Sequence, residues 1–261
     1  MHDILDLTRF PIDEPNTPEW QNLVDRCRAD IAAEGMFNLE GLMRVDVAAD
    51  VADGLMPRFE AESFEHARMH NIYFKKSIPD VPDDHPALAR FETSNRTLCG
   101  DQLGQGALLA LYEWAPFAQF LAACIGKETL HTMADPLARV NVMAYREGQA
   151  LNWHFDRSEF TTTLLLQAPE QGGGFEYCSD LRSDDDPNYD GVARLLRGQE
   201  ATREITLSAG TLNVFAGKNT AHRVTPVQGV KDRVIAVFSY YETPDVMFSE
   251  EERVGFYGRA S

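Results

Sequence analysis

The sequence has 261 residues, of which 44% are hydrophobic and 25% are charged, and these proportions are typical of a folded globular protein. No segment has the roughly 20 consecutive apolar residues that cross a membrane, and the N-terminal MHDILDLTRF has no apolar signal-peptide core. The formal net charge of -17 repels phosphate backbones. We therefore expect a cytoplasmic protein that has neither a membrane nor a nucleic acid as its partner.

The four cysteines, Cys27, Cys99, Cys124 and Cys178, show no CxxC spacing. Zinc ribbons and thioredoxin-like motifs require that spacing, so both are excluded. In a cytoplasmic protein the usual state of such residues is a reduced and mostly buried thiol, which we expect here.

The first part of the chain, residues 1–137, is predicted to be mostly helical. Thr17 and Pro18 form a typical helix start and Gly35 a typical helix end, which predicts a helix over 17–35. The other expected segments are an extended piece at 36–43, a helix at about 46–68, an irregular stretch at 72–98 that contains three prolines, and a helix at about 104–125 in which Pro116 starts a new segment.

From about residue 138 the hydrophobic period changes to 2, which is the period of strands. The predicted strands are Ala138–Tyr145, Leu151–Asp156, Thr161–Gln167, Gly174–Cys178, Thr211–Phe215, Ala221–Pro226 and Arg233–Tyr241. This cadence is typical of a sandwich or open barrel. We expect an α+β fold in one domain, 1–261, with a β core at 138–245, an acidic insertion at 179–204 that contains a short helix at Val192–Gly198, and a C-terminal tail at 246–261.

The segment Asn152-Trp153-His154-Phe155-Asp156 contains two metal-ligand residue types two positions apart. On a strand, such residues point to the same face. A second histidine, His222, lies in a later predicted strand. Two histidines and one carboxylate form the facial triad of non-haem Fe(II) oxygenases, which leaves coordination positions open for a cosubstrate and oxygen. The sequence therefore predicts iron ligation by His154, Asp156 and His222.

Two further polar residues flank this set. Arg233 follows His222 after a predicted turn at 226–232, and an antiparallel return would place its guanidinium beside the metal, where it can bind a carboxylate through two parallel hydrogen bonds. Tyr145 precedes His154, and a hairpin near Gly148 would return its hydroxyl to the pocket wall. These residues are candidates for binding a dicarboxylate cosubstrate.

The pattern Tyr145…Gly148…His154-x-Asp156…Gly173-Gly174…His222…Arg233 resembles the Fe(II)/2-oxoglutarate-dependent dioxygenases. The Tyr-x-x-Gly segment is similar to that of prolyl-hydroxylase-like and AlkB-like members, and the layout resembles small bacterial hydroxylases of free or N-substituted amino acids. The resemblance implies a double-stranded β-helix (jelly-roll, cupin-like) core, three iron ligands as above, and O2 as the oxidant.

The resemblance also implies roles for the residues around the iron. Arg233 would bind the distal carboxylate of 2-oxoglutarate, with Tyr145 and either Asn141 or Thr163 helping. Many members carry Ser or Thr two residues after the arginine, where this chain has Ile235. Related halogenases have Gly or Ala in place of the metal carboxylate, so Asp156 favours hydroxylation, desaturation or ring chemistry over halogenation.

The primary substrate is expected to be a small molecule. Candidates for its recognition are Arg157, Arg96, Phe175 and Tyr177, although the two aromatic residues are also ordinary core candidates and Arg157 is equally well an exposed charge. An arginine that faces the pocket would favour an acidic substrate, such as an amino acid or an N-acyl derivative. A homodimer is compatible with the sequence.

Three alternatives compete with this interpretation. His66 and His70 have the spacing of one helical turn, which can bind zinc, but His-Ala-Arg-Met-His has no Glu as general base. A metal isomerase or a dioxygenase without 2-oxoglutarate would share the β fold but would not need Arg233. A non-catalytic ligand-binding barrel would not need an open-coordination metal site.

Overall fold

The computed structural model describes residues 1–79 and 81–261. Its helices are α1 (Pro18–Glu34), α2 (Val45–Glu62), the short 3-10 helix η1 (Pro86–Leu88), α3 (Ala107–Tyr112), α4 (Ala115–Cys124), α5 (Tyr189–Leu196) and α6 (Glu250–Tyr257). Its strands are β1 (Met36–Leu39), β2 (Phe64–His70), β3 (Phe91–Leu98), β4 (His131–Thr132), β5 (Val140–Tyr145), β6 (Leu151–His154), β7 (Thr161–Gln167), β8 (Gln171–Gly172), β9 (Phe175–Cys178), β10 (Arg203–Ile205), β11 (Leu212–Phe215), β12 (Ala221–Val224), β13 (Val227–Gln228), β14 (Arg233–Phe238) and β15 (Tyr240–Tyr241).

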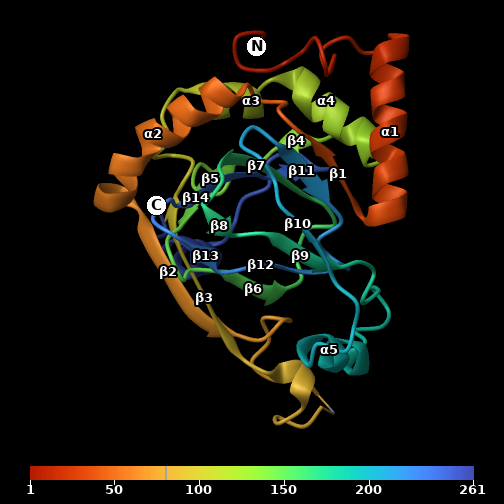
Figure 1. The fold of residues 1–261 in the computed structure, drawn as a ribbon, viewed down its shortest axis with the longest axis vertical. Helices are drawn as coiled ribbons and strands as arrows, with labels where there is room; N and C mark the ends of the chain where they lie inside the picture. Colours follow the sequence, from red (N-terminus) through yellow and green to blue (C-terminus); the bar gives the residue numbers. More distant parts are fainter. Residues whose placement is uncertain (80) are drawn as a thin grey trace.

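The larger sheet contains seven strands in the order β1-β11-β7-β14-β5-β3-β2, and every neighbouring pair is antiparallel. A smaller antiparallel sheet has the order β10-β9-β12-β6. In Figure 1 the helices α2 to α4 arch over the larger sheet and α1 stands at its right-hand side next to β1, whereas β6, β9 and β12 lie lower in the view. The β2–β3 hairpin runs along one edge of both layers.

Side-chain alternation divides the larger sheet into two faces. Val140, Val142 and Ala144 of β5 belong to the main hydrophobic core, which also contains the buried residues of α1, α2 and α4. Because successive residues of a strand point to opposite faces, Met143 and Tyr145 turn away from the helices, and they pack in a separate cluster. The helices thus cover one face of the sheet, and the other face is directed to the smaller sheet.

The first helix begins and ends as its sequence predicts. The Thr17 side chain accepts a hydrogen bond from the backbone N–H of Trp20, Pro18 occupies the first turn, and Gly35 closes the helix with φ of 76°. Glycine adopts this left-handed conformation without the steric cost of a Cβ atom. The expected break in the helix at 104–125 is also present, since α3 and α4 are separate helices.

Three segments differ from the sequence-based expectation. The helix expected over 46–68 ends at Glu62, and β2 follows it. The stretch at 72–98, expected to be irregular, contains β3. The expected C-terminal tail contains α6, whose first turn carries a capping box in which Ser249 and Glu252 bind each other's backbone N–H groups.

The predicted strands of the second half are confirmed with shifts of one or a few residues at their ends. The exception is the last run, 233–241, which divides into β14 and β15. The short helix expected at Val192–Gly198 is α5, which begins earlier at Tyr189. Among the described residues, no helix is long and apolar enough to cross a membrane.

Candidate metal centre

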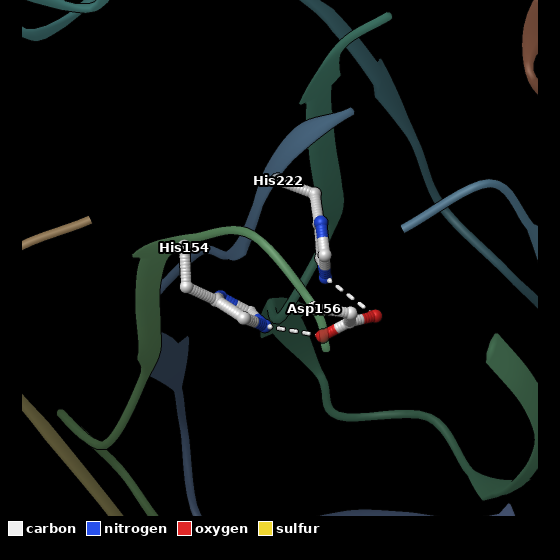
Figure 2. Close-up of side chains that lie close together, drawn as sticks. All are labelled: His154, Asp156 and His222. Carbon is white, nitrogen blue, oxygen red and sulfur yellow. Dashed lines mark ion pairs between the residues drawn. The ribbon is translucent and has the colours of Figure 1, made fainter. Parts of the chain in front are cut away.

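His154, Asp156 and His222 converge between the two sheets. One ligand atom of each lies within 4.8 Å of the others. The Nε2 atom of His154 lies 3.3 Å from Oδ1 of Asp156, and Nε2 of His222 lies 3.5 Å from Oδ2. Figure 2 shows that the two rings approach different oxygens of the one carboxylate. The structure thus brings together the three residues that the sequence singles out.

Backbone carbonyls orient both imidazole rings. Nδ1 of His154 lies 2.8 Å from the carbonyl oxygen of Asn152, and Nδ1 of His222 lies 3.0 Å from that of Thr220. A carbonyl oxygen only accepts, so each Nδ1 carries the proton and donates it. This tautomer leaves the Nε2 lone pair of each ring free for a metal ion, as is typical of histidine ligands.

The third ligand lies just beyond the strand on which it was expected. β6 ends at His154, and the backbone N–H of Asp156 donates to the carbonyl of Gly217 at 3.0 Å. Thr161 on β7 donates a 2.5 Å hydrogen bond to Oδ2 of Asp156. A Cβ atom at Gly217 would lie 2.2 Å from the same oxygen, so only glycine fits there. Thr161 of the larger sheet and Gly217 of the loop between β11 and β12 therefore fix the position of the carboxylate.

The ionisation states suit metal binding. Burial would raise the pKa of Asp156, but the adjacent rings of His222 and His154 outweigh burial and hold this pKa well below its usual value. Burial lowers the pKa of His154, and the charge of His222 lowers it further. A neutral imidazole and an ionised carboxylate are the forms that coordinate a metal.

Two aromatic rings pack against the His222 ring. The ring centroids of Phe215 and Phe175 lie 4.8 Å and 5.4 Å from that of His222. Phe175 and Phe215 pack with Tyr177 and Met36 in one buried cluster. Phe175 therefore lies at the site, and Tyr177, which pairs directly with His222 between β9 and β12, has its ring centroid 5.7 Å from that of Phe175.

Arg233 is almost fully buried, with 2% of its surface exposed, and within the described part of the chain its Nη1 atom has no hydrogen-bond partner. It lies directly opposite Tyr145 in the pairing of β14 with β5, and its guanidinium lies 5.8 Å from the Tyr145 ring. Burial lowers the pKa of this arginine. A cavity of about 200 Å³ is lined by Arg233, Leu165 and Phe175, among other residues, and Phe175 stacks on His222.

The route that brings Arg233 and Tyr145 to this region differs from the expectation. We expected a turn at 226–232 and a hairpin near Gly148 to return these residues beside the triad. Instead β12 and β6 pair with each other in the smaller sheet, while β14 and β5 pair in the larger one. The connections cross between sheets, so the arginine faces the metal ligands from the opposite layer.

The remaining predicted residues have other partners. Asn141 donates to the carbonyl of Leu137, and its Oδ1 accepts from the hydroxyl of Tyr257 at 2.9 Å, so it ties α6 to the sheet. The hydroxyl of Thr163 lies 3.4 Å from the carbonyl oxygen of Asn213, and Thr163 lies on the inner face two residues from Thr161.

The two arginines proposed for substrate binding are both ion-paired. Arg96 lies on the helix-covered face, pairs with Glu60 and Asp232, and contacts the Phe59 ring of α2. Arg157 is 68% exposed at its side chain and pairs with Glu252 at 2.8 Å. The face on which Arg96 lies separates it from the triad, so the structure does not support its proposed contact with substrate.

A cluster that the sequence analysis missed lies on the edge strand β2. His66, Arg68 and His70 face inward, and the Phe74 ring stacks on that of His70 at a centroid distance of 4.3 Å. Burial lowers the pKa of His70 to about 4, so this ring is neutral near pH 7. Residue types that alternate along 64–70 could have indicated a strand, but most of these residues were assigned to the preceding helix.

Comparison with known proteins decides the family. The profile of the family described as Halogenase D matches residues 102–253, which is more than half of the chain. The chain belongs to this family. No curated protein matches it.

Solved structures with a similar fold include prolyl hydroxylases and an alpha ketoglutarate dependent epimerase, all of low sequence identity to this chain. A prolyl-4-hydroxylase of Pseudomonas putida is 17% identical, covers 83% of this chain and 98% of its own, and gives a TM-score of 0.51. AviO1 of Streptomyces viridochromogenes is 15% identical over 86% and 97%, with a TM-score of 0.56. The epimerase SnoN, solved with Fe3+ and alpha ketoglutarate, is 14% identical over 84% of each chain, with a TM-score of 0.56. These structures share the fold that the predicted resemblance implies.

Proposed function

We propose that this protein is an Fe(II)- and 2-oxoglutarate-dependent oxygenase that hydroxylates an unactivated C–H bond of a small molecule, such as an amino acid or an N-substituted amino acid, and releases succinate and CO2. The observation that carries the proposal is the combination of two sites. Three metal ligands converge on one side of the inter-sheet space, and a buried arginine that has no counter-ion among the described residues faces it from the other. The two sheets would then form a double-stranded β-helix.

The donor set fits iron. Two imidazole nitrogens and one carboxylate are the facial triad, which suits Fe(II) and leaves positions open for other ligands. Bound Fe(II) together with 2-oxoglutarate supplies the oxidising chemistry, which belongs to the cofactor rather than to the chain. The chain contributes the orientation of its ligands, through Thr161 and the carbonyls of Asn152 and Thr220, and the apolar surroundings that Phe175 and Phe215 provide.

Arg233 fits the distal carboxylate of 2-oxoglutarate. A buried guanidinium has five donors, and a carboxylate accepts two of them in parallel. The orphaned Nη1 and the adjoining cavity make a bound anion the natural partner of this charge. A dioxygenase that works without 2-oxoglutarate leaves such an arginine unexplained, and a non-catalytic ligand-binding protein of this fold leaves the metal ligands unexplained.

The family description raises halogenation as a second candidate. A halide needs the metal position that a carboxylate otherwise takes, and here Asp156 lies within 3.5 Å of both histidines and accepts a hydrogen bond from Thr161. Because the position is filled and supported, we propose oxygen transfer rather than halogenation for this member of the family.

The test measures succinate formed from 2-oxoglutarate in air, with Fe(II) and ascorbate present and candidate small molecules added. The wild-type protein should form succinate, and the rate should rise with a true substrate. His222→Ala should form none, because one of three ligands is lost. Succinate formation by His222→Ala at the wild-type rate would show that this metal site does not carry the activity.

A further inference from the structure

The edge strand β2 presents a cation to the inter-sheet space. Its burial alternates strictly, with Glu65, Ala67 and Met69 exposed to solvent and the intervening residues partly or fully buried. Arg68 belongs to the inward set and lies opposite Thr93 in the pairing with β3. An inward-facing arginine at a sheet edge is costly to desolvate, so its presence calls for a partner.

Aromatic rings connect Arg68 to the metal centre. The guanidinium carbon lies 4.4 Å from the centroid of the Phe74 ring, which is a cation–π contact. The same ring lies edge-on to His154, with centroids 5.9 Å apart. Arg68 is therefore separated from a metal ligand by the width of one phenyl ring, a span that an amino-acid-sized molecule covers.

Arg68 has no counter-ion within the described ranges. None of the ion pairs there includes it, and its buried Nε has no hydrogen-bond partner. Burial lowers the pKa of Arg68. The positive charge of the nearby Arg157 lowers this pKa further, so the surroundings of Arg68 supply another cation rather than a carboxylate. By contrast, Arg96 on the adjacent strand pairs with two carboxylates. Among the described residues, Arg68 thus shares with Arg233 an orphaned nitrogen and the lack of a counter-ion, in a chain whose net charge is -17.

The turn after β2 holds Phe74 in a strained position. Phe74 has φ of 54°, which is a left-handed conformation that costs a bulky residue roughly 1–3 kcal/mol. Asn71 stabilises the turn, because its Oδ1 accepts hydrogen bonds from the backbone N–H groups of Tyr73 and Lys75. Phe74 is nevertheless 40% exposed, so burial in the core does not account for this strain. Strain of this kind is typical of ligand-binding sites.

We infer that Arg68, supported by the Phe74 ring beside His154, binds a carboxylate of the primary substrate. The inference rests on the proposed function and names its substrate class: an amino-acid-sized acid whose C–H bond lies toward the iron. A planar guanidinium with a buried, unused Nε–H can bind a carboxylate through two parallel hydrogen bonds. The cosubstrate is a different anion at a different place, because Arg233 lies on β14, which β5 and β3 separate from β2.

The test uses matched pairs of probes: the twenty common amino acids and their N-acetyl derivatives, each as the acid and as the neutral primary carboxamide. The protein is loaded anaerobically with Fe(II) and 2-oxoglutarate, which in this enzyme class gives a weak visible charge-transfer band, and substrate binding is followed as a shift of that band. The variants are Arg68→Met and, as the matched control, Arg90→Met. Arg90 is exposed at the end of the same hairpin and, in the part of the chain that the structure describes, its side chain donates a hydrogen bond only to the carbonyl of Met69.

At least one acid should shift the band of the wild-type protein while its carboxamide does not. Arg68→Met should weaken the response to that acid at least about 30-fold, as expected when one partner of a buried charge pair is removed, and Arg90→Met should not. Equal responses to acid and carboxamide, no response to any acid, or an undiminished response of Arg68→Met would each overturn the inference. Failure of the band to form at all would instead reject the proposed function, so the two failures are distinguishable.

Discussion

Replacing Arg233 by methionine should make the ligand-free protein more stable while abolishing cosubstrate binding. The side chain is 2% exposed, and its Nη1 lacks a hydrogen-bond partner among the described residues. An unsatisfied buried donor costs about 1–3 kcal/mol, and more when it is charged. Methionine has a similar length and needs no partner, so Arg233→Met should raise the free energy of unfolding of the apo-protein by about 1–3 kcal/mol.

Binding of 2-oxoglutarate should make the wild-type protein more stable than Arg233→Met, the reverse of the order expected without it. A ligand at 100 times its dissociation constant stabilises the protein that binds it by about 2.7 kcal/mol. Wild-type protein should gain this amount from 2-oxoglutarate, with Mn(II) as an air-stable substitute for Fe(II). Arg233→Met should gain almost nothing, because loss of a buried charged contact costs about 2–5 kcal/mol of binding free energy.

The assay is urea unfolding of each protein, followed by circular dichroism, with and without Mn(II) and 2-oxoglutarate. Arg96→Met is the control, because Arg96 is buried to a similar degree at 4% exposure but is paired with Glu60 and Asp232. Its loss leaves Asp232 without its buried partner and should destabilise the protein by about 3–5 kcal/mol. If Arg233→Met destabilises the apo-protein as Arg96→Met does, or still gains stability from 2-oxoglutarate, the reasoning is wrong.

Three further changes test the surroundings of the site. Thr161→Val removes the hydrogen bond to Asp156 and should weaken Fe(II) binding about 10- to 100-fold in a metal titration, whereas Thr162→Val, on the opposite face of β7, should bind iron normally. Asp156→Gly should abolish hydroxylation and open a position for halide; product analysis in chloride that finds undiminished hydroxylation would contradict its role as a ligand. Burial raises the pKa of Asp135, but hydrogen bonds from Arg253 and backbone N–H groups outweigh it and hold this pKa below the usual value. Asp135→Asn should therefore destabilise the protein at pH 7, and the difference should vanish as the pH falls well below about 4; a pH-independent difference in urea midpoints would refute this.

The second half of the chain was predictable because its strands alternate and are separated by turn residues. The triad could be found for the same reason: histidine and aspartate two positions apart, with a later histidine, are a local pattern. The role of Arg233 could be predicted from its chemistry, but the strand pairing that brings it to the site could not. The pairing of β14 with β5 rather than with β12 depends on contacts between distant segments. Sequence spacing does not encode which sheet a strand joins.

The first half misled for a physical reason. Residues 64–70 carry His66, Arg68 and His70, and residues four apart share a face on a helix and on a strand alike. The sequence shows no clear helix-ending residue at Glu62, where α2 ends, so the strand that follows was predicted as part of the helix. The Arg68 cluster was lost with this boundary, although it supplies the only cation of β2 that faces inward.

The most direct test of the account is an anaerobic titration of the metal-free protein with Fe(II) and then with 2-oxoglutarate, followed by visible absorption. The account predicts a weak charge-transfer band that saturates at one iron and one 2-oxoglutarate per chain and that is absent in Arg233→Met, which still binds iron. If iron binds but no band forms on addition of 2-oxoglutarate, the protein is a metal protein of another kind and the proposed cosubstrate is wrong.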